Sequence, residues 1–162
     1  MSDPANAAAR WQDMVSLVTR LALGGIFIYM GASKTAHPEE FLKLVRQYDL
    51  TNSHLVLNVI GATLPWFEIF CGLLLVAGVG VRGVSLVLAV ILAAFTVAVW
   101  QRALALQAAR GIPFCAVKFD CGCGNGEVYI CHKLPENLGL MLLCCWLLAG
   151  RGRAWCLRYG WR

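Results

Sequence analysis

Residues 84–105 read VSLVLAVILAAFTVAVWQRALA and are rich in Val, Leu and Ala. Three further apolar segments lie at about 15–33, 55–79 and 134–149. Long uninterrupted apolar runs are typical of membrane-spanning helices, which need about 20 residues to cross a bilayer. The sequence therefore predicts an all-α fold, in which one membrane domain (residues 1–162) forms an integral membrane four-helix bundle.

The connections between the predicted spans follow from local sequence. From residue 38 to residue 53, apolar side chains recur at three- and four-residue spacing among charged ones. This pattern predicts a short amphipathic helix after the first span. The segment 80–83 begins and ends with glycine, so a tight turn there should make the second and third spans antiparallel neighbours. Pro135 and Glu136 suit the first turn of the fourth span.

The composition supports a membrane protein and excludes one class of partner. Of the 162 residues, 59% are hydrophobic and 14% charged, against about 25% charged in soluble domains. The net charge of +5 is spread along the chain, and no basic block with interleaved aromatics indicates nucleic-acid binding. The N-terminus lacks the basic start of a cleavable signal peptide. We therefore expect membrane lipid, not nucleic acid, around this chain.

A polar, glycine-rich loop at residues 111–133 separates the third and fourth spans and carries Cys115, Cys121, Cys123, Cys131 and His132. Glycine between Cys121 and Cys123 leaves the backbone free to turn two closely spaced thiols toward each other or toward a third group. The remaining cysteines lie in apolar segments or in the basic tail, where inert packing is the usual role; they are Cys71, Cys144, Cys145 and Cys156. For the loop, redox exchange, soft-metal binding and structural bridging are all open.

Several polar motifs carry a family resemblance over about residues 17–150. Gly31-Ala-Ser-Lys34 is followed by Leu64-Pro-Trp-Phe-Glu68, and Cys121-Gly-Cys-Gly124 precedes Glu136-Asn137. In this order the motifs resemble the DoxX/MauE membrane protein family, and the cysteine motif is closest to the methylamine utilisation MauE branch. The resemblance implies a four-helix membrane protein with thiol or quinone chemistry. It also implies a thioredoxin-like partner that works in disulfide formation.

The redox interpretation assigns Cys121 and Cys123 as the catalytic pair. A disulfide between them closes a very small ring, which should make the bond easy to reduce. Cys115 and Cys131 would be auxiliary thiols, or a second disulfide that relays electrons or braces the loop. Thiolate formation needs nearby positive charge, which three neighbouring residues could supply: Lys118, His132 and Lys133.

The same side chains also fit two other interpretations. Cys115, Cys121, Cys123, Cys131 and His132 offer enough soft or borderline ligands for a closed tetrahedral zinc site. Alternatively, two disulfides could simply brace the loop of an extracytoplasmic subunit.

Glu68 is the second candidate, because a carboxylate about halfway along a membrane helix is costly unless it is paired or hydrated. It could relay protons to a quinone or hydrogen-bond one. The structural alternative is that Glu68 pairs with Arg20, Lys34 or a backbone group and fixes the packing of the helices.

The sequence thus predicts a membrane thiol–disulfide redox protein, a possible oxidoreductase that passes electrons between loop cysteines and a quinone or a thioredoxin-like partner. The alternative is a non-catalytic subunit of a larger respiratory or electron-transfer membrane complex. Basic residues concentrate in the tail and in the 80–83 turn, which predicts cytoplasmic termini in a bacterial-type inner (plasma) membrane. The cysteine-rich loop would then be extracytoplasmic, where disulfides persist.

Overall fold

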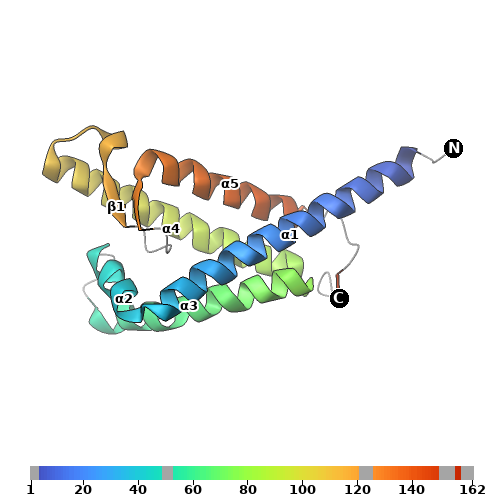
Figure 1. Cartoon of the computed structure of the whole chain (residues 1–162), viewed down its shortest axis with the longest axis horizontal. Helices are drawn as coiled ribbons and strands as arrows, with labels where there is room; N and C mark the ends of the chain where they lie inside the picture. Colours follow the sequence, from blue (N-terminus) through green and yellow to red (C-terminus); the bar gives the residue numbers. More distant parts are fainter. Residues whose placement is uncertain (1–3, 49–52, 121–125, 150–155, 158–162) are drawn as a thin grey trace.

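A computed structural model describes residues 4–48, 53–120, 126–149 and 156–157. Within them the chain forms the helices α1 (Pro4–Ala36), α2 (Pro38–Gln47), α3 (His54–Ala77), α4 (Val81–Arg110) and α5 (Ile130–Leu148). A 3-10 turn η1 (Phe114–Ala116) and the strands β1 (Lys118–Asp120) and β2 (Glu127–Tyr129) lie between α4 and α5. The long helices run back and forth along the molecule, and α2 and the strands lie at one end of it (Figure 1).

The chain is mostly helical, as the apolar runs predict. Three helical segments are long and apolar enough to cross a membrane, namely Arg10–Ala36, His54–Ala77 and Val81–Arg110. They contain the first three predicted spans, apart from the last residues of the second. Helix α5 has 19 residues and is not one of these three segments among the described residues.

Glycines with left-handed backbone conformations mark the end of α3 and both ends of α4. Gly78 follows α3 with φ +71°, and its N–H bonds to carbonyls of the last turn. Gly80 precedes α4 with φ +57°, and Gly111 follows it with φ +62°. Because side chains other than glycine rarely adopt positive φ, these residues set the helix boundaries. A tight turn does join α3 to α4, but it lies at residues 78–80 and not at the predicted 80–83, because Val81, Arg82 and Gly83 already belong to the first turn of α4.

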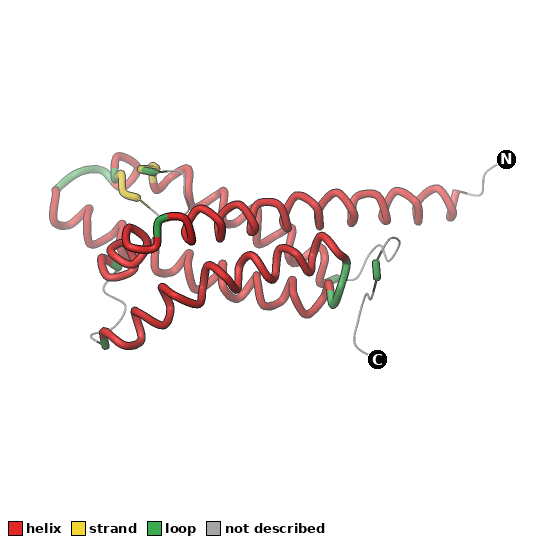
Figure 2. Tube along the Cα trace, turned by 60° about the horizontal axis from the view of Figure 1, so that its bottom comes forward, coloured by secondary structure: helices red, strands yellow, loops and turns green. Residues whose placement is uncertain are grey.

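Helices α1 and α3 run side by side in both ribbon views (Figure 1 and Figure 2), and glycines lie at their closest contacts. A Cβ placed on Gly24 would lie 2.8 Å from the Gly72 carbonyl oxygen, and one on Gly72 would lie 2.7 Å from the Gly24 carbonyl oxygen. At Gly31 a Cβ would lie 2.6 Å from the Pro65 carbonyl oxygen. Only hydrogen fits at these contacts, as is common where helices pack in lipid. The contacts also place Lys34 of α1 one turn beyond Gly31, beside α3.

The start of the last helix differs from the prediction. We expected it at about residue 134, with Pro135 in its first turn, but α5 begins at Ile130 and Pro135 lies inside it. Tertiary contacts hold the added turn, because Ile130 is fully buried and Lys133 is nearly so. A covalent bond at Cys131, described below, adds a further restraint.

Two antiparallel strands, which the sequence did not suggest, form a hairpin in the cysteine-rich loop. Lys118 pairs with Tyr129, Phe119 with Val128, and Asp120 with Glu127. The connection between the strands is residues 121–126, of which 121–125 lie outside the described residues. One buried cluster anchors the hairpin on the helices; its members are Met30, Val99, Ala103, Val117, Phe119 and Ile130.

Candidate functional site

A disulfide between Cys115 and Cys131 closes the base of the hairpin. Cys115 lies in η1 and is exposed, whereas Cys131 lies in the first turn of α5 and is half-buried. The bond therefore links the segment before β1 to the helix after β2. The two cysteines predicted as auxiliary thiols are brought together as one disulfide. The predicted catalytic pair, Cys121 and Cys123, lies outside the described residues.

The charges predicted around the loop divide into exposed and buried ones. Lys118 Nζ lies 4.4 Å from the centre of the Tyr129 ring, and hydrogen bonding to the Tyr129 phenol raises the pKa of Lys118. His132 is exposed and its ring lies 6.2 Å from that of Tyr129. Lys133 is buried and pairs with Glu136 at 3.0 Å. Lys118 and His132 are thus exposed on the hairpin side, whereas Lys133 is buried in an ion pair.

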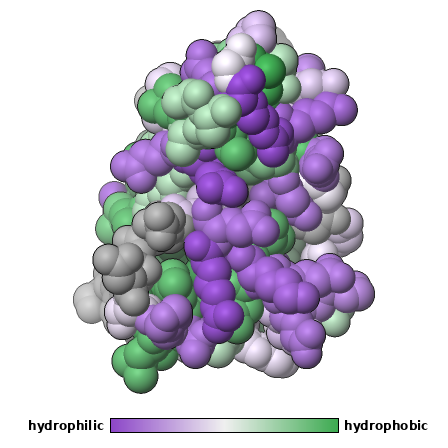
Figure 3. Space-filling model, turned by 90° about the vertical axis from the view of Figure 1, so that its left-hand side faces the viewer, coloured by the Kyte–Doolittle hydropathy of each residue, from purple (hydrophilic) through white to green (hydrophobic). Residues whose placement is uncertain are grey.

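Figure 3 faces the end of the molecule that carries α2 and the hairpin, and hydrophilic side chains cover much of it. A small polar pocket of about 190 Å³ opens there. Its lining includes Lys34, His37 and Glu40 on one side and Asp120 and Gly126 on the other. The last two residues flank the segment that holds Cys121 and Cys123 in the sequence. The pocket therefore lies between the helices and the described ends of the hairpin.

Glu68 forms a buried ion pair with Lys34. Lys34 Nζ donates to both carboxylate oxygens at 2.6 Å, and the two residues are 3% and 6% exposed. Lys34 Nζ also lies 5.3 Å from the centre of the Phe41 ring of α2. The sequence offered three partners for Glu68, and the structure shows Lys34. The close packing of α1 on α3 places the Lys34 side chain beside the Glu68 carboxylate. Arg20 instead lies at the far end, where it donates to Cys156.

An apolar cavity of about 390 Å³ lies next to this ion pair, between α1, α2, α3 and α4. Its walls are almost wholly aliphatic or aromatic; the polar residues that reach it are Lys34, Tyr48 and Glu68. Lys34 and Phe41 line both this cavity and the polar pocket. The ion pair is therefore the junction between an apolar interior and the polar end of the molecule. The sequence carried no signal for the cavity, because its walls come from helices that are distant along the chain.

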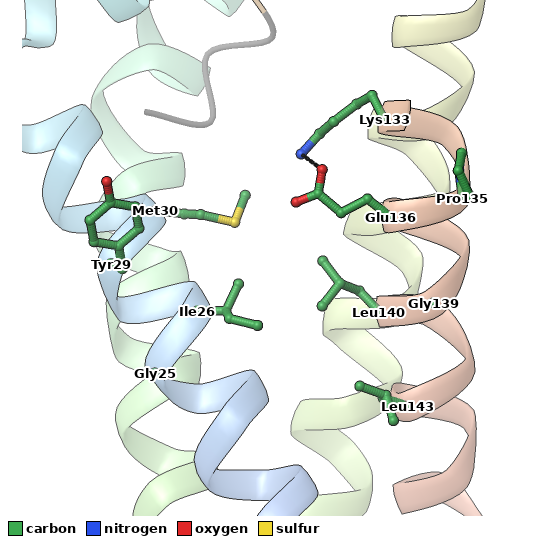
Figure 4. A pocket seen from close by; sticks show the side chains of 10 residues that line it. All are labelled: Gly25, Ile26, Tyr29, Met30, Lys133, Pro135, Glu136, Gly139, Leu140 and Leu143. Atoms are coloured by element: carbon green, nitrogen blue, oxygen red, sulfur yellow. Dashed lines mark hydrogen bonds and ion pairs between the residues drawn. The ribbon is translucent and has the colours of Figure 1, made fainter. Parts of the chain in front are cut away.

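A larger cleft of about 660 Å³ separates α1 from α5. Figure 4 shows Ile26 and Met30 of α1 facing Leu140 and the Lys133–Glu136 pair of α5 across it. A Cβ on Gly25 or Gly139, which also line the cleft, would meet nothing within 4 Å. The two helices are thus not packed together along this stretch.

The zinc interpretation has no support from the described part of the chain. No group of three or more His, Cys, Asp or Glu side chains among these residues is arranged to hold a metal ion. Cys115 and Cys131 are bonded to each other, and a bonded cysteine offers no thiolate to a metal. The full set of five ligands stays untested, since two of its members lie outside the described residues.

Together, the long apolar helices and the buried ion pair define a helical protein of membrane type that carries a disulfide-closed hairpin at one end. The chain belongs to the MauE family: the family model described as methylamine utilisation protein MauE matches residues 12–150. The predicted resemblance to MauE is thereby confirmed, whereas the broader relation to DoxX stays a prediction. No curated protein and no solved structure matches the chain.

Proposed function

We propose that this protein is a membrane thiol–disulfide exchange protein whose reactive cysteines lie in the loop between α4 and α5. Cys121 and Cys123 form the pair that exchanges with a thioredoxin-like partner. The Cys115–Cys131 disulfide holds the ends of the loop and can pass electrons onward. The proposal places α1, α3, α4 and α5 in a bacterial-type inner membrane as four spans, with α2 at the interface.

One observation carries this proposal: the Cys115–Cys131 disulfide lies at the polar end of the helices with one of its cysteines exposed. An exposed disulfide is open to attack by a thiolate, which is the first step of exchange. The cation of Lys118, on the strand that leads to Cys121, favours thiolate formation in the loop.

The orientation is part of the proposal. Helix α1 begins and α5 ends on the side of the molecule away from the hairpin (Figure 1). An even number of crossings with cytoplasmic termini would put the hairpin in an oxidising compartment, where a disulfide persists.

Differential alkylation of the protein in native membranes, read by mass spectrometry, tests the proposal. Mild reductant should open a Cys121–Cys123 bond first and a Cys115–Cys131 bond at higher reductant concentration. Cys145, which is exposed on α5, is the matched control and should label equally before and after reduction. Labelling of Cys121 and Cys123 that depends on a chelator and not on reductant would replace the redox proposal with the metal one.

A second candidate is a non-catalytic subunit of a larger membrane complex. The open cleft between α1 and α5 favours it, because apolar helix faces left apart in one chain can be filled by a partner helix. In that case reductant should change the stability of the complex and not its electron transfer, and the protein should co-purify with other membrane subunits in fixed stoichiometry.

A further inference from the structure

The apolar cavity between α1, α2, α3 and α4 has the features of a ligand site. Its volume of about 390 Å³ lies within the range of about 300 to 1,000 Å³ seen for small-molecule sites. Such sites combine apolar walls with a few polar groups that fix the orientation of the ligand. Here the aromatic walls include Phe27, Phe41 and Phe95, and the polar groups are Tyr48 and the Lys34–Glu68 pair.

Lys34 is poised to bind a carbonyl oxygen. Its ammonium group has three N–H donors, and the Glu68 carboxylate accepts two of them. The third N–H is left for a ligand in the cavity, which Lys34 lines. A ligand carbonyl that accepts this hydrogen bond would lie close to the Glu68 carboxylate.

The cavity and the disulfide belong to one packed region. Met30 lines the cavity and is a member of the buried cluster that anchors the hairpin. Tyr48, Phe95 and Cys131 pack against the same cluster, and the rings of Tyr48 and Phe95 lie 6.2 Å apart. The polar pocket reaches Lys34 from the hydrophilic end, so protons can arrive there while the ligand stays in apolar surroundings.

We propose that this cavity binds a lipid-soluble quinone, which accepts the electrons of the cysteines. This inference rests on the proposed function, because thiol oxidation needs a two-electron acceptor. Reduced Cys115 and Cys131 lose two electrons and two protons as their S–S bond forms. The quinone takes up two electrons and two protons and leaves as the hydroquinone. Lys34 hydrogen-bonds one quinone oxygen, and the polar pocket, lined by His37 and Glu40, exchanges protons with solvent.

The test uses the full chain in lipid nanodiscs and a short-chain benzoquinone that carries one isoprene unit. Binding to the oxidised protein, followed by tryptophan fluorescence quenching, needs no thiol chemistry. Ala94→Phe places a ring in the cavity, of which Ala94 is a lining residue, and should weaken binding at least about tenfold. Ala93→Phe, one position along the same helix, is the matched control: both alanines are exposed, but Ala93 does not line the cavity, so this variant should stay within about twofold of the wild type.

Photolabelling of the wild-type protein with an azidoquinone locates the binding site without any substitution. It therefore keeps the proposal testable if a variant fails to fold. We expect labels on cavity residues such as Met30, Tyr48 or Phe95, and none on Leu143 in the α1–α5 cleft. Labels confined to residues outside the cavity, or equal binding by Ala94→Phe and Ala93→Phe, would overturn the proposal. It would also be overturned if an isoprenoid alcohol without the quinone ring competed equally, since the cavity would then hold a lipid chain.

The electron transfer is tested separately. The quinone added to reduced wild-type protein should restore the Cys115–Cys131 disulfide with one hydroquinone formed per disulfide. If the quinone binds in the cavity without restoring the bond, its role as acceptor is wrong. If a dithiol partner still exchanges with the loop cysteines while no quinone binds, the cavity proposal fails and the proposed function stands.

Discussion

The buried Lys34–Glu68 pair allows a direct test of the packing between α1 and α3. We consider three variants: Lys34→Met, Glu68→Gln and the double variant. Each single change leaves one charge buried without its partner, since the two residues are only 6% and 3% exposed. Loss of one member of a buried pair costs about 3 to 5 kcal/mol. The double variant buries no charge, so it should cost much less than the sum of the two single changes.

The measurement is a double-mutant cycle of unfolding free energies, from SDS titration in mixed micelles followed by tryptophan fluorescence. We expect a coupling energy of about 2 kcal/mol or more, because both oxygens accept from the same Nζ at 2.6 Å. This exceeds the roughly 0.6 kcal/mol that is typical of polar contacts between membrane helices. Lys43→Met, at an exposed position of α2, is the control and should change the free energy by less than about 0.5 kcal/mol. Single costs that add to the double cost within about 0.5 kcal/mol would refute the ion pair.

Three further predictions concern the disulfide, the α1–α3 contact and the hairpin. Cys115→Ser should lower the unfolding free energy by about 3 kcal/mol, the value for a loop of about 15 residues, and should remove most of the shift that reductant causes in the SDS midpoint of the wild type. A shift in this variant as large as that of the wild type would contradict the Cys115–Cys131 bond. Gly24→Ala should lower the unfolding free energy by about 1 to 3 kcal/mol, because its Cβ would lie 2.8 Å from a carbonyl oxygen of α3. Gly25→Ala is the control and should leave the unfolding free energy unchanged, because its Cβ meets nothing within 4 Å. Equal losses in the two variants would disprove the close approach of α1 and α3. Lys118→Gln should slow alkylation of the reduced loop thiols at pH 8 by about twofold, with the effect lost in 1 M salt. Because the pKa of Lys118 is raised, its ammonium group stays charged while the thiols titrate. The difference in alkylation rate between the wild type and Lys118→Gln should therefore vanish only as the pH rises beyond that raised pKa. An equal rate in both proteins at pH 8 would show that this charge does not act on the thiols.

The positions of the helices could be predicted from the sequence, but not all of their ends. The apolar runs located the helices. A turn between α3 and α4 was also predicted, but too far along the chain, because Gly83 lies inside α4 and Gly78 ends α3. The first turn of α5 was missed, because a rule that favours proline at a helix start ignores tertiary restraints. Ile130 is buried and Cys131 is bonded to η1, and these contacts extend the helix beyond what local preference indicates.

The candidate site was predicted by residue type and not by arrangement. Four loop cysteines allow three pairings, and no spacing rule selects Cys115 with Cys131. That choice depends on the hairpin, whose strands bring the two ends of the loop together. The hairpin itself left no clear pattern, because strands of three residues are too short to show alternation.

The sequence by itself determined that this chain is helical and apolar, and that four of its eight cysteines lie close together around the loop before its last apolar segment. It did so because hydrophobic length and residue type are local properties. Only the tertiary structure decided that Glu68 pairs with Lys34, that an apolar cavity lies beside this pair, and that Cys115 bonds to Cys131. Each of these features depends on how close two distant segments come, and that distance is set by glycine contacts between helices and by the packing of the hairpin on the helices.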